Sequence, residues 1–306
     1  MQTRPLHPRF GVEIEGVDLR TVSASRHYRH IRALFEEHSV LLFKRQTLDD
    51  DAHTDLASQF GPIEDRAADA ARTRARTRPP VPLLTNLNEA GDGALAPNSL
   101  TTLNLVANSF WHTDSTFLRK PALLNAITAR VVPSSGGATE LVSTRAAWDD
   151  LPPALQRRAE ATVFLHSVLP SRIQTDARLL EIPEVTRYQG QAWRAHWPNP
   201  ENGRNALYIA NHIYGARDCD WRAARAFAED LIERATQPEC IYAHEWETGD
   251  VLIWDERATM HRVRPWPYEE VRTLASICVT AGGRDGVDLV TPADGPIRDD
   301  ELFQAA

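Results

Sequence analysis

A histidine and a carboxylate stand two positions apart in the first half of the chain. The segment 111–117 reads Trp-His-Thr-Asp-Ser-Thr-Phe, which places His112 and Asp114 at i and i+2. In a β-strand, two such side chains point to the same face. An imidazole and a carboxylate that converge on one point can occupy two corners of a metal site. The third ligand must then come from a different strand.

Several histidines further along the chain are candidates for that third ligand, namely His166, His196, His212, His244 and His261. We favour His261, because it follows an apolar segment at 249–256 that ends in polar residues, where a side chain would face the mouth of a barrel. Two histidines and one carboxylate with an open opposite face form the arrangement that holds non-haem Fe(II) for oxygen chemistry. Three protein ligands leave positions for a chelating cosubstrate and O2.

The motifs of several other familiar enzyme chemistries are absent from this sequence. The chain has no Gly-x-Ser-x-Gly elbow, no Walker-type phosphate loop and no complete Gly-x-Gly-x-x-Gly. Its three cysteines, Cys219, Cys240 and Cys278, form no Cys-x-x-Cys pair and no even-numbered disulfide framework. This cysteine usage is typical of a reducing compartment.

Charge and hydropathy narrow the range of partners. The 306 residues include 34 Lys and Arg against 42 Asp and Glu, a formal net charge of −8, which argues against a nucleic-acid partner. No apolar run reaches the roughly 18 residues of a transmembrane helix, and the first nine residues lack the apolar stretch of a secretory signal. We expect a cytoplasmic protein that acts on a small molecule, without a membrane partner, and leave open whether it forms a homo-oligomer.

Short apolar runs separated by turn signals predict a mainly β protein with flanking helices. Helices are expected at 23–38, with Ser23 as N-cap, and at 49–59, 152–162 and 221–236. Strands are expected at 10–18, 39–44, 81–87, 122–132, 139–142, 161–168, 206–210, 240–246, 251–254 and 272–280. Many strands with few helices favour a β-sandwich or jelly roll.

We expect residues 1–306 to form a single domain, because no boundary separates two self-sufficient cores. The segment 65–108 differs in character from the rest, since it contains Pro79, Pro80 and a series of arginines, and we expect one strand in it. A long excursion of this kind is often a lid or active-site loop. The polar tail at 284–306 is expected to be a surface strap. The arginines of the segment are Arg66, Arg72, Arg74, Arg76 and Arg78.

Three segments together carry a resemblance to a known family. They are 111–117, then Pro-Ser-Ser-Gly-Gly-Ala-Thr at 133–139, then Trp-Asp-Glu-Arg-Ala-Thr-Met-His at 254–261 followed by Arg272. In this order and spacing they resemble the Fe(II)/2-oxoglutarate dioxygenases of the taurine dioxygenase and 2,4-dichlorophenoxyacetate dioxygenase family, and the similarity runs over nearly the whole chain.

The resemblance implies a double-stranded β-helix (jelly-roll) core in which His112, Asp114 and His261 are the catalytic iron ligands. It also implies that Thr139 and Arg272 bind the cosubstrate 2-oxoglutarate. A guanidinium can grip a carboxylate bidentately, and a hydroxyl can add a further donor. The implied reaction uses O2 to hydroxylate an aliphatic C–H and converts 2-oxoglutarate to succinate and CO2. Asp114 favours hydroxylation, because the related halogenases replace this carboxylate with Gly or Ala.

One position departs from the family pattern. Where the best-known members carry a second Arg that binds the sulfonate or carboxylate of the substrate, this chain has Ser276, which supplies no charge. The resemblance places Asn108 and Phe117 in the pocket lining. We hypothesise that Arg72 or one of its neighbours Arg74 and Arg76 replaces the missing charge. The expected substrate is small, anionic or aromatic, and aryloxyalkanoate-like. A second departure is Glu256, where many relatives carry Asn, and we read no functional consequence from it.

Three alternatives stay open at this point. One is a natural-product tailoring oxygenase of the same family that hydroxylates or desaturates its substrate. Another is a non-catalytic, cupin-like binding protein that keeps the His-x-Asp pair. The third is a zinc hydrolase. An oxygenase releases succinate, a binding protein does not, and a hydrolase acts without O2.

Overall fold

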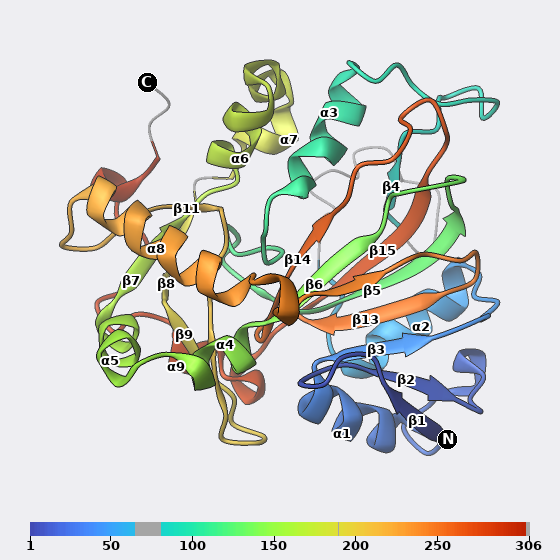
Figure 1. Ribbon diagram of the computed structural model, residues 1–306, viewed down its shortest axis with the longest axis horizontal. Helices are drawn as coiled ribbons and strands as arrows, with labels where there is room; N and C mark the ends of the chain where they lie inside the picture. Colours follow the sequence, from blue (N-terminus) through green and yellow to red (C-terminus); the bar gives the residue numbers. More distant parts are fainter. Residues whose placement is uncertain (65–80, 189, 304–306) are drawn as a thin grey trace.

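The largest sheet has seven strands, which come from both the N-terminal and the C-terminal parts of the chain. The computed structural model describes residues 1–64, 81–188 and 190–303 (Figure 1). All strand pairs of this sheet are antiparallel except β2 with β3, which is parallel. The strands run in the order β1 (Gln2–Pro5), β2 (Val12–Glu15), β3 (Val40–Phe43), β13 (Val251–Asp255), β5 (Ala122–Val131), β15 (Thr273–Thr280) and β4 (Leu83–Thr85).

A three-stranded sheet faces this main sheet. It has the antiparallel order β12 (Tyr242–His244), β6 (Thr139–Ser143) and β14 (Thr259–Val263). Leu141 of β6 packs in one buried cluster with Leu252 and Trp254 of β13, so the two sheets share an apolar layer. Two sheets packed face to face in this way are the arrangement expected for a jelly roll.

Two smaller sheets and several helices complete the molecule. One small sheet is β11 (Ile213–Ala216), β7 (Val163–His166) and β8 (Gln191–Arg194), and the other is β9 (His196–Pro198) with β10 (Asn205–Leu207). The helices α5 (Pro153–Ala161) and α8 (Trp221–Ala235) confirm the sequence prediction closely. The short helices were not predicted; they are α4 (Thr144–Asp150), α6 (Leu169–Thr175), α7 (Pro183–Thr186) and α9 (Val287–Val290).

The central strands are buried on both faces, and this explains their continuous apolar runs. In β3, Leu41 and Phe43 belong to one buried cluster, whereas Val40 and Leu42 belong to the cluster between the two sheets. Successive side chains of a strand point to opposite faces. The same alternation in β5 and β15 directs Asn125, Ile127 and Ser276 toward the interior between the sheets.

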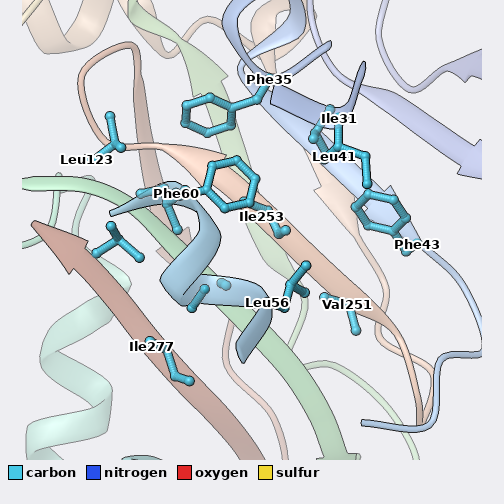
Figure 2. Close-up of a cluster of buried hydrophobic side chains, with 14 of the residues drawn as sticks. Ile31, Phe35, Leu41, Phe43, Leu56, Phe60, Leu123, Val251, Ile253 and Ile277 are labelled. Atoms are coloured by element: carbon cyan, nitrogen blue, oxygen red, sulfur yellow. The ribbon is translucent and has the colours of Figure 1, made fainter. Parts of the chain in front are cut away.

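Helices α1 (Tyr28–His38) and α2 (Asp50–Phe60) cover the outer face of the main sheet. Figure 2 shows Phe35 of α1 and Phe60 of α2 packed against the sheet residues Leu123 and Ile253. All four side chains are at most 1% exposed. These two helices therefore cover the face of the main sheet that is turned away from the three-stranded sheet.

The start of α1 differs from the expectation. Ser23 does not cap the helix, because its backbone closes a turn with Arg26 through two hydrogen bonds of 3.0 Å. The helix begins instead after His27, whose φ of 64° breaks the helical path. The expected start of α2 is confirmed, since Asp49 Oδ1 accepts a hydrogen bond of 2.8 Å from the Ala52 amide.

The segment 81–108 is more ordered than a long loop. The one strand expected here is confirmed as β4, but the segment also contains α3 (Leu100–Val106) and the 3-10 helix η3 (Ala107–Ser109), which were not predicted. The arginines at 65–80 that the sequence analysis considered for substrate binding, Arg72 among them, lie outside the described residues. Helices α3 and α6 contact each other and the 3-10 helix η4 (Ala177–Glu181), and Figure 1 shows α3, α6 and α7 at one end of the molecule.

The polar tail is held by buried contacts. Val290 of α9 is fully buried in the cluster under the main sheet, and the Trp197 indole donates a 2.9 Å hydrogen bond to the Asp285 carbonyl. Arg217 pairs with Glu301 at 2.8 Å. The remaining 3-10 helices are η1 (Leu19–Thr21), η5 (Pro238–Cys240), η6 (Gly283–Asp285) and η7 (Asp299–Glu301). Within the described ranges, no helix is both long and apolar enough to cross a membrane.

Candidate active site

Two histidines face each other across a single antiparallel backbone pair. The His112 amide donates to the His261 carbonyl at 3.0 Å, and the His261 amide donates back at 2.8 Å. Directly opposite residues of such a pair carry their side chains on the same face. The ring centroids are therefore only 4.2 Å apart. His261 lies on β14, a strand that the sequence analysis did not predict.

Asp114 completes a cluster of three donors. Its Oδ1 lies 3.7 Å from His112 Nε2, and its Oδ2 lies 3.8 Å from His261 Nε2. The three ligand atoms are all within 4.8 Å of one another. The sequence analysis expected Asp114 to share a strand with His112. The structure instead places Asp114 at the start of a turn, in which Ser115 adopts a φ of 58°. The turn nevertheless directs the carboxylate to the histidines.

Both imidazoles are in the form that binds metals. His112 Nδ1 lies 2.7 Å from the Phe110 carbonyl, which requires a proton on Nδ1 and leaves the Nε2 lone pair directed at the cluster. Burial lowers the pKa of His112, and burial together with the neighbouring His112 lowers the pKa of His261 to about 3. Two neutral imidazoles and one carboxylate fit a divalent metal ion.

A chain of hydrogen bonds orients the Asp114 carboxylate. Asn125 Nδ2 donates to Asp114 Oδ2 at 2.8 Å, and the Ser276 hydroxyl donates to Asn125 Oδ1 at 2.9 Å. The sequence analysis placed Ser276 at a substrate-binding position of the family and missed Asn125. The alternation of β5 and β15 was the signal that could have placed both residues on the interior face.

Glu256 forms hydrogen bonds with Asp114 and with Trp254. Its Oε2 accepts a 2.9 Å hydrogen bond from the Asp114 amide, and its Oε1 accepts one of 2.6 Å from the Trp254 indole. Burial and the charge of Asp114 raise the pKa of Glu256 well above its usual value. Glu256, from which the sequence analysis read no consequence, thus connects the turn of Asp114 to Trp254, whose ring packs 4.6 Å from His261.

The described residues of the predicted site line one cavity of about 290 Å³. Arg72, which the sequence analysis also suggested for the substrate, lies outside the described residues. The predicted residues that do line the cavity are Asn108, His112, Asp114, Phe117, Thr139, His261, Arg272 and Ser276. Residues far apart in the sequence therefore converge on one space, as the resemblance to the family implies.

Arg272 forms one wall of this cavity. Its Nε and Nη2 donate to the Gly137 carbonyl at 3.2 and 3.0 Å, and its guanidinium lies 5.2 Å from the Trp266 ring centre. Gly137 has a φ of +72°, and a Cβ there would lie 3.1 Å from Arg272 Nε, so glycine is required at this turn. Burial lowers the pKa of Arg272 to about 10, which keeps it charged at neutral pH.

Thr139 lies on the same cavity wall as Arg272. Its Oγ1 accepts a 3.0 Å hydrogen bond from the Trp246 indole, which leaves its hydroxyl proton available to a ligand. The structure shows no ion pair between Arg272 and any residue of the described ranges. A buried guanidinium next to a free hydroxyl proton is suited to bind a carboxylate.

Comparisons with known proteins agree with this geometry. The family model of the taurine catabolism dioxygenases (TauD, TfdA family) matches residues 2–278. The chain is 34% identical over 276 residues to the alpha-ketoglutarate-dependent 2,4-dichlorophenoxyacetate dioxygenase of Cupriavidus pinatubonensis, covering 88% of this chain and 94% of that one. It is 27% identical to the (S)-phenoxypropionate/alpha-ketoglutarate-dioxygenase of Delftia acidovorans, covering 90% and 93%.

A solved structure shares the fold over almost its full length. The crystal structure of AAD-2 in complex with Mn(II) and N-oxalylglycine has a TM-score of 0.84 and 30% identity, covering 94% of this chain and 99% of that one. The jelly-roll fold predicted from the sequence is thereby confirmed. The chain belongs to the TauD, TfdA family and is a dioxygenase that depends on 2-oxoglutarate, the compound also called alpha-ketoglutarate.

Proposed function

We propose that the chain is an Fe(II)- and 2-oxoglutarate-dependent dioxygenase that hydroxylates an aliphatic C–H of a small aryloxyalkanoate-like acid and releases succinate. One observation carries this proposal. Two histidines and a carboxylate lie within 4.8 Å of one another at a cavity whose wall holds Arg272, a buried cation available to a carboxylate. Family membership favours this function over the cupin-like binding protein and the zinc hydrolase.

The residues of the cavity have distinct roles in this proposal. His112 and His261 would hold the metal through Nε2, and Asp114 through a carboxylate oxygen. Arg272 and the Thr139 hydroxyl would bind the distal carboxylate of 2-oxoglutarate. When bound, Fe(II) with 2-oxoglutarate and O2 supplies the oxidising power for hydroxylation.

The remaining contribution of the chain is positioning and the exclusion of water. Phe117 and Tyr188 form an aromatic contact of 5.2 Å in the cavity wall, beside the apolar residues Ile182 and Val185. An aromatic ring can pack against this wall, which holds the reacting C–H in place and keeps water out. The names of the relatives from Cupriavidus and Delftia support an aryloxy acid.

We also infer that residues 1–306 form one dioxygenase domain, in which 65–108 is an active-site segment. This inference is supported by Asn104, Leu105 and Asn108, which come from that segment and line the cavity.

A succinate assay tests the proposed function. Purified protein with Fe(II), ascorbate, 2-oxoglutarate and O2 is given a panel of aryloxyacids, alkylsulfonates and amino-acid derivatives. We expect succinate release that requires both O2 and metal and is stimulated most by aryloxyacids. The His261→Ala variant should lose it. Product formed without O2 would identify a hydrolase, and an iron-loaded protein that never forms succinate would identify a binding protein.

A further inference from the structure

A second arginine, Arg172, reaches the same cavity from α6. Its Nη1 donates to the Ser171 hydroxyl at 3.1 Å, and its Nη2 makes a long contact of 3.4 Å with Asn108 Oδ1. Its Nε is buried and has no hydrogen-bond partner in the part of the chain that the structure describes. The described partners therefore leave part of the hydrogen-bonding capacity of this cavity-lining guanidinium unused.

The charge of Arg172 is also without a close counter-ion. Arg262, another cavity residue, pairs with Glu140 at 2.6 Å, whereas no carboxylate of the described ranges forms an ion pair with Arg172. Burial lowers the pKa of Arg172 to about 10, while the charge of Asp114 opposes that shift, so the side chain is cationic at neutral pH. A cation held away from water without a partner is costly, and an anionic ligand removes that cost.

Several apolar residues line the same cavity as Arg172. Val168 precedes it on the approach to α6, and Ile182 and Val185 come from the segment around α7, all lining the cavity. Phe117 adds an aromatic ring to the same wall. An isolated cation within an apolar wall fits a ligand with an anionic head and an apolar body.

Ser276 and Arg172 line the same cavity but belong to different parts of the fold. Ser276 lies on β15 of the main sheet, and its hydroxyl is committed to Asn125. Arg172 lies on the helices that Figure 1 shows at one end of the molecule, together with α3 and α7. The lid arginines considered in the sequence analysis, including Arg72, lie outside the described residues.

We propose that Arg172 binds the anionic group of the substrate, a carboxylate or a sulfonate, through its guanidinium, while Arg272 binds 2-oxoglutarate. This proposal rests on the proposed function and specifies its substrate: an amphipathic monoanion whose head group is held by α6 and not by the main sheet. Asn108, in contact with Arg172, is a positioning residue that orients the guanidinium.

Binding without turnover tests the proposal. The protein is loaded with Mn(II) and N-oxalylglycine and titrated calorimetrically with phenoxyacetate, its neutral isostere phenoxyacetamide, and phenylmethanesulfonate. We expect wild type to bind an anion about 100-fold more tightly than the amide, as a charge-assisted bidentate contact provides. The Arg172→Met variant should bind acid and amide equally. The relative affinities of phenoxyacetate and the sulfonate distinguish the two head groups.

The controls separate a binding role from a structural one. Arg178→Met removes an exposed arginine of η4 that pairs with Asp176, and it should leave the acid-to-amide ratio unchanged. Arg172→Gln loses the charge but keeps a polar group, and it should lose the ratio even if the Met variant unfolds.

Two results would overturn the proposal: a wild type that does not distinguish acid from amide, or a folded Arg172 variant that keeps the wild-type ratio. Succinate release from 2-oxoglutarate without added substrate distinguishes the two levels of inference. If wild type and Arg172→Met both release succinate but the ratio is unchanged, only the role of Arg172 fails. If wild type releases none under any condition, the proposed function itself fails.

Discussion

Asn125 offers a direct test of how the metal-binding carboxylate is held. Replacing Asn125 by Leu keeps the approximate volume of the side chain but removes the 2.8 Å hydrogen bond to Asp114 Oδ2 and the partner of the Ser276 hydroxyl. The Cys278 thiol, 3.9 Å from the same carboxylate oxygen, is a much weaker donor. The carboxylate of the variant is therefore free to rotate away from the two histidines.

The expected loss follows from the geometry. A hydrogen bond to a charged group contributes about 1.5–3 kcal/mol. The Asp114 side chain is 24% exposed, so water replaces part of the lost bond and the lower half of that range applies. We expect metal binding weakened about 13- to 45-fold, within the range of about 10- to 100-fold typical of residues that orient a ligand. Ser276→Ala, which removes one neutral bond further out, should weaken it by only about 2- to 5-fold.

The assay is an anaerobic titration of the metal-free protein with Mn(II) or Fe(II), combined with urea unfolding of each variant. Thr128→Val is the matched control, because Thr128 lies on the same strand, is equally buried at 2% exposure and contacts His53 on the opposite face. It should change stability without changing metal affinity. An Asn125→Leu protein that folds normally and binds metal as tightly as wild type would refute the assigned role of Asn125.

Three further outcomes are expected. Arg272→Met should raise the KM for 2-oxoglutarate about 10- to 100-fold, measured by succinate release, because a charge-assisted contact is lost; an unchanged KM would contradict this. Arg257→Met should lower the free energy of unfolding in urea by about 3–5 kcal/mol, since it removes the guanidinium that lies 2.8 Å from both buried carboxylates and leaves Asp255 with Arg145 at 3.8 Å and Glu36 with Arg32. Although burial raises the pKa of Glu36, the charge of Arg257 and further partners lower it below its ordinary 4.5. The stability from this shift is present above the ordinary pKa of 4.5 and is lost as the pH falls through the lowered pKa, so Glu36→Gln should flatten that dependence in urea unfolding.

Local pattern was sufficient for one part of the site. The i, i+2 spacing of His112 and Asp114 indicates a shared face, whereas the roles of Thr139 and Arg272 were implied only by the resemblance to the family. Alternating and continuous apolar runs predicted most of the main-sheet strands, because side-chain direction in a strand depends only on neighbouring residues. The short helices α3 and α6 escaped prediction, since their stability comes from packing rather than from a periodic apolar face.

Only the tertiary structure decided which distant residues meet. The spacing alone could not choose among the candidate histidines, and the antiparallel pair of His112 with His261 is what selects one. Nor could it show that the Ser276 hydroxyl is directed at Asn125, or that Arg172 lines the same cavity. The physical reason is the same in each case. The sequence by itself determines residue types and the faces they share within one element, whereas strand pairing and helix packing are long-range choices that depend on the whole core.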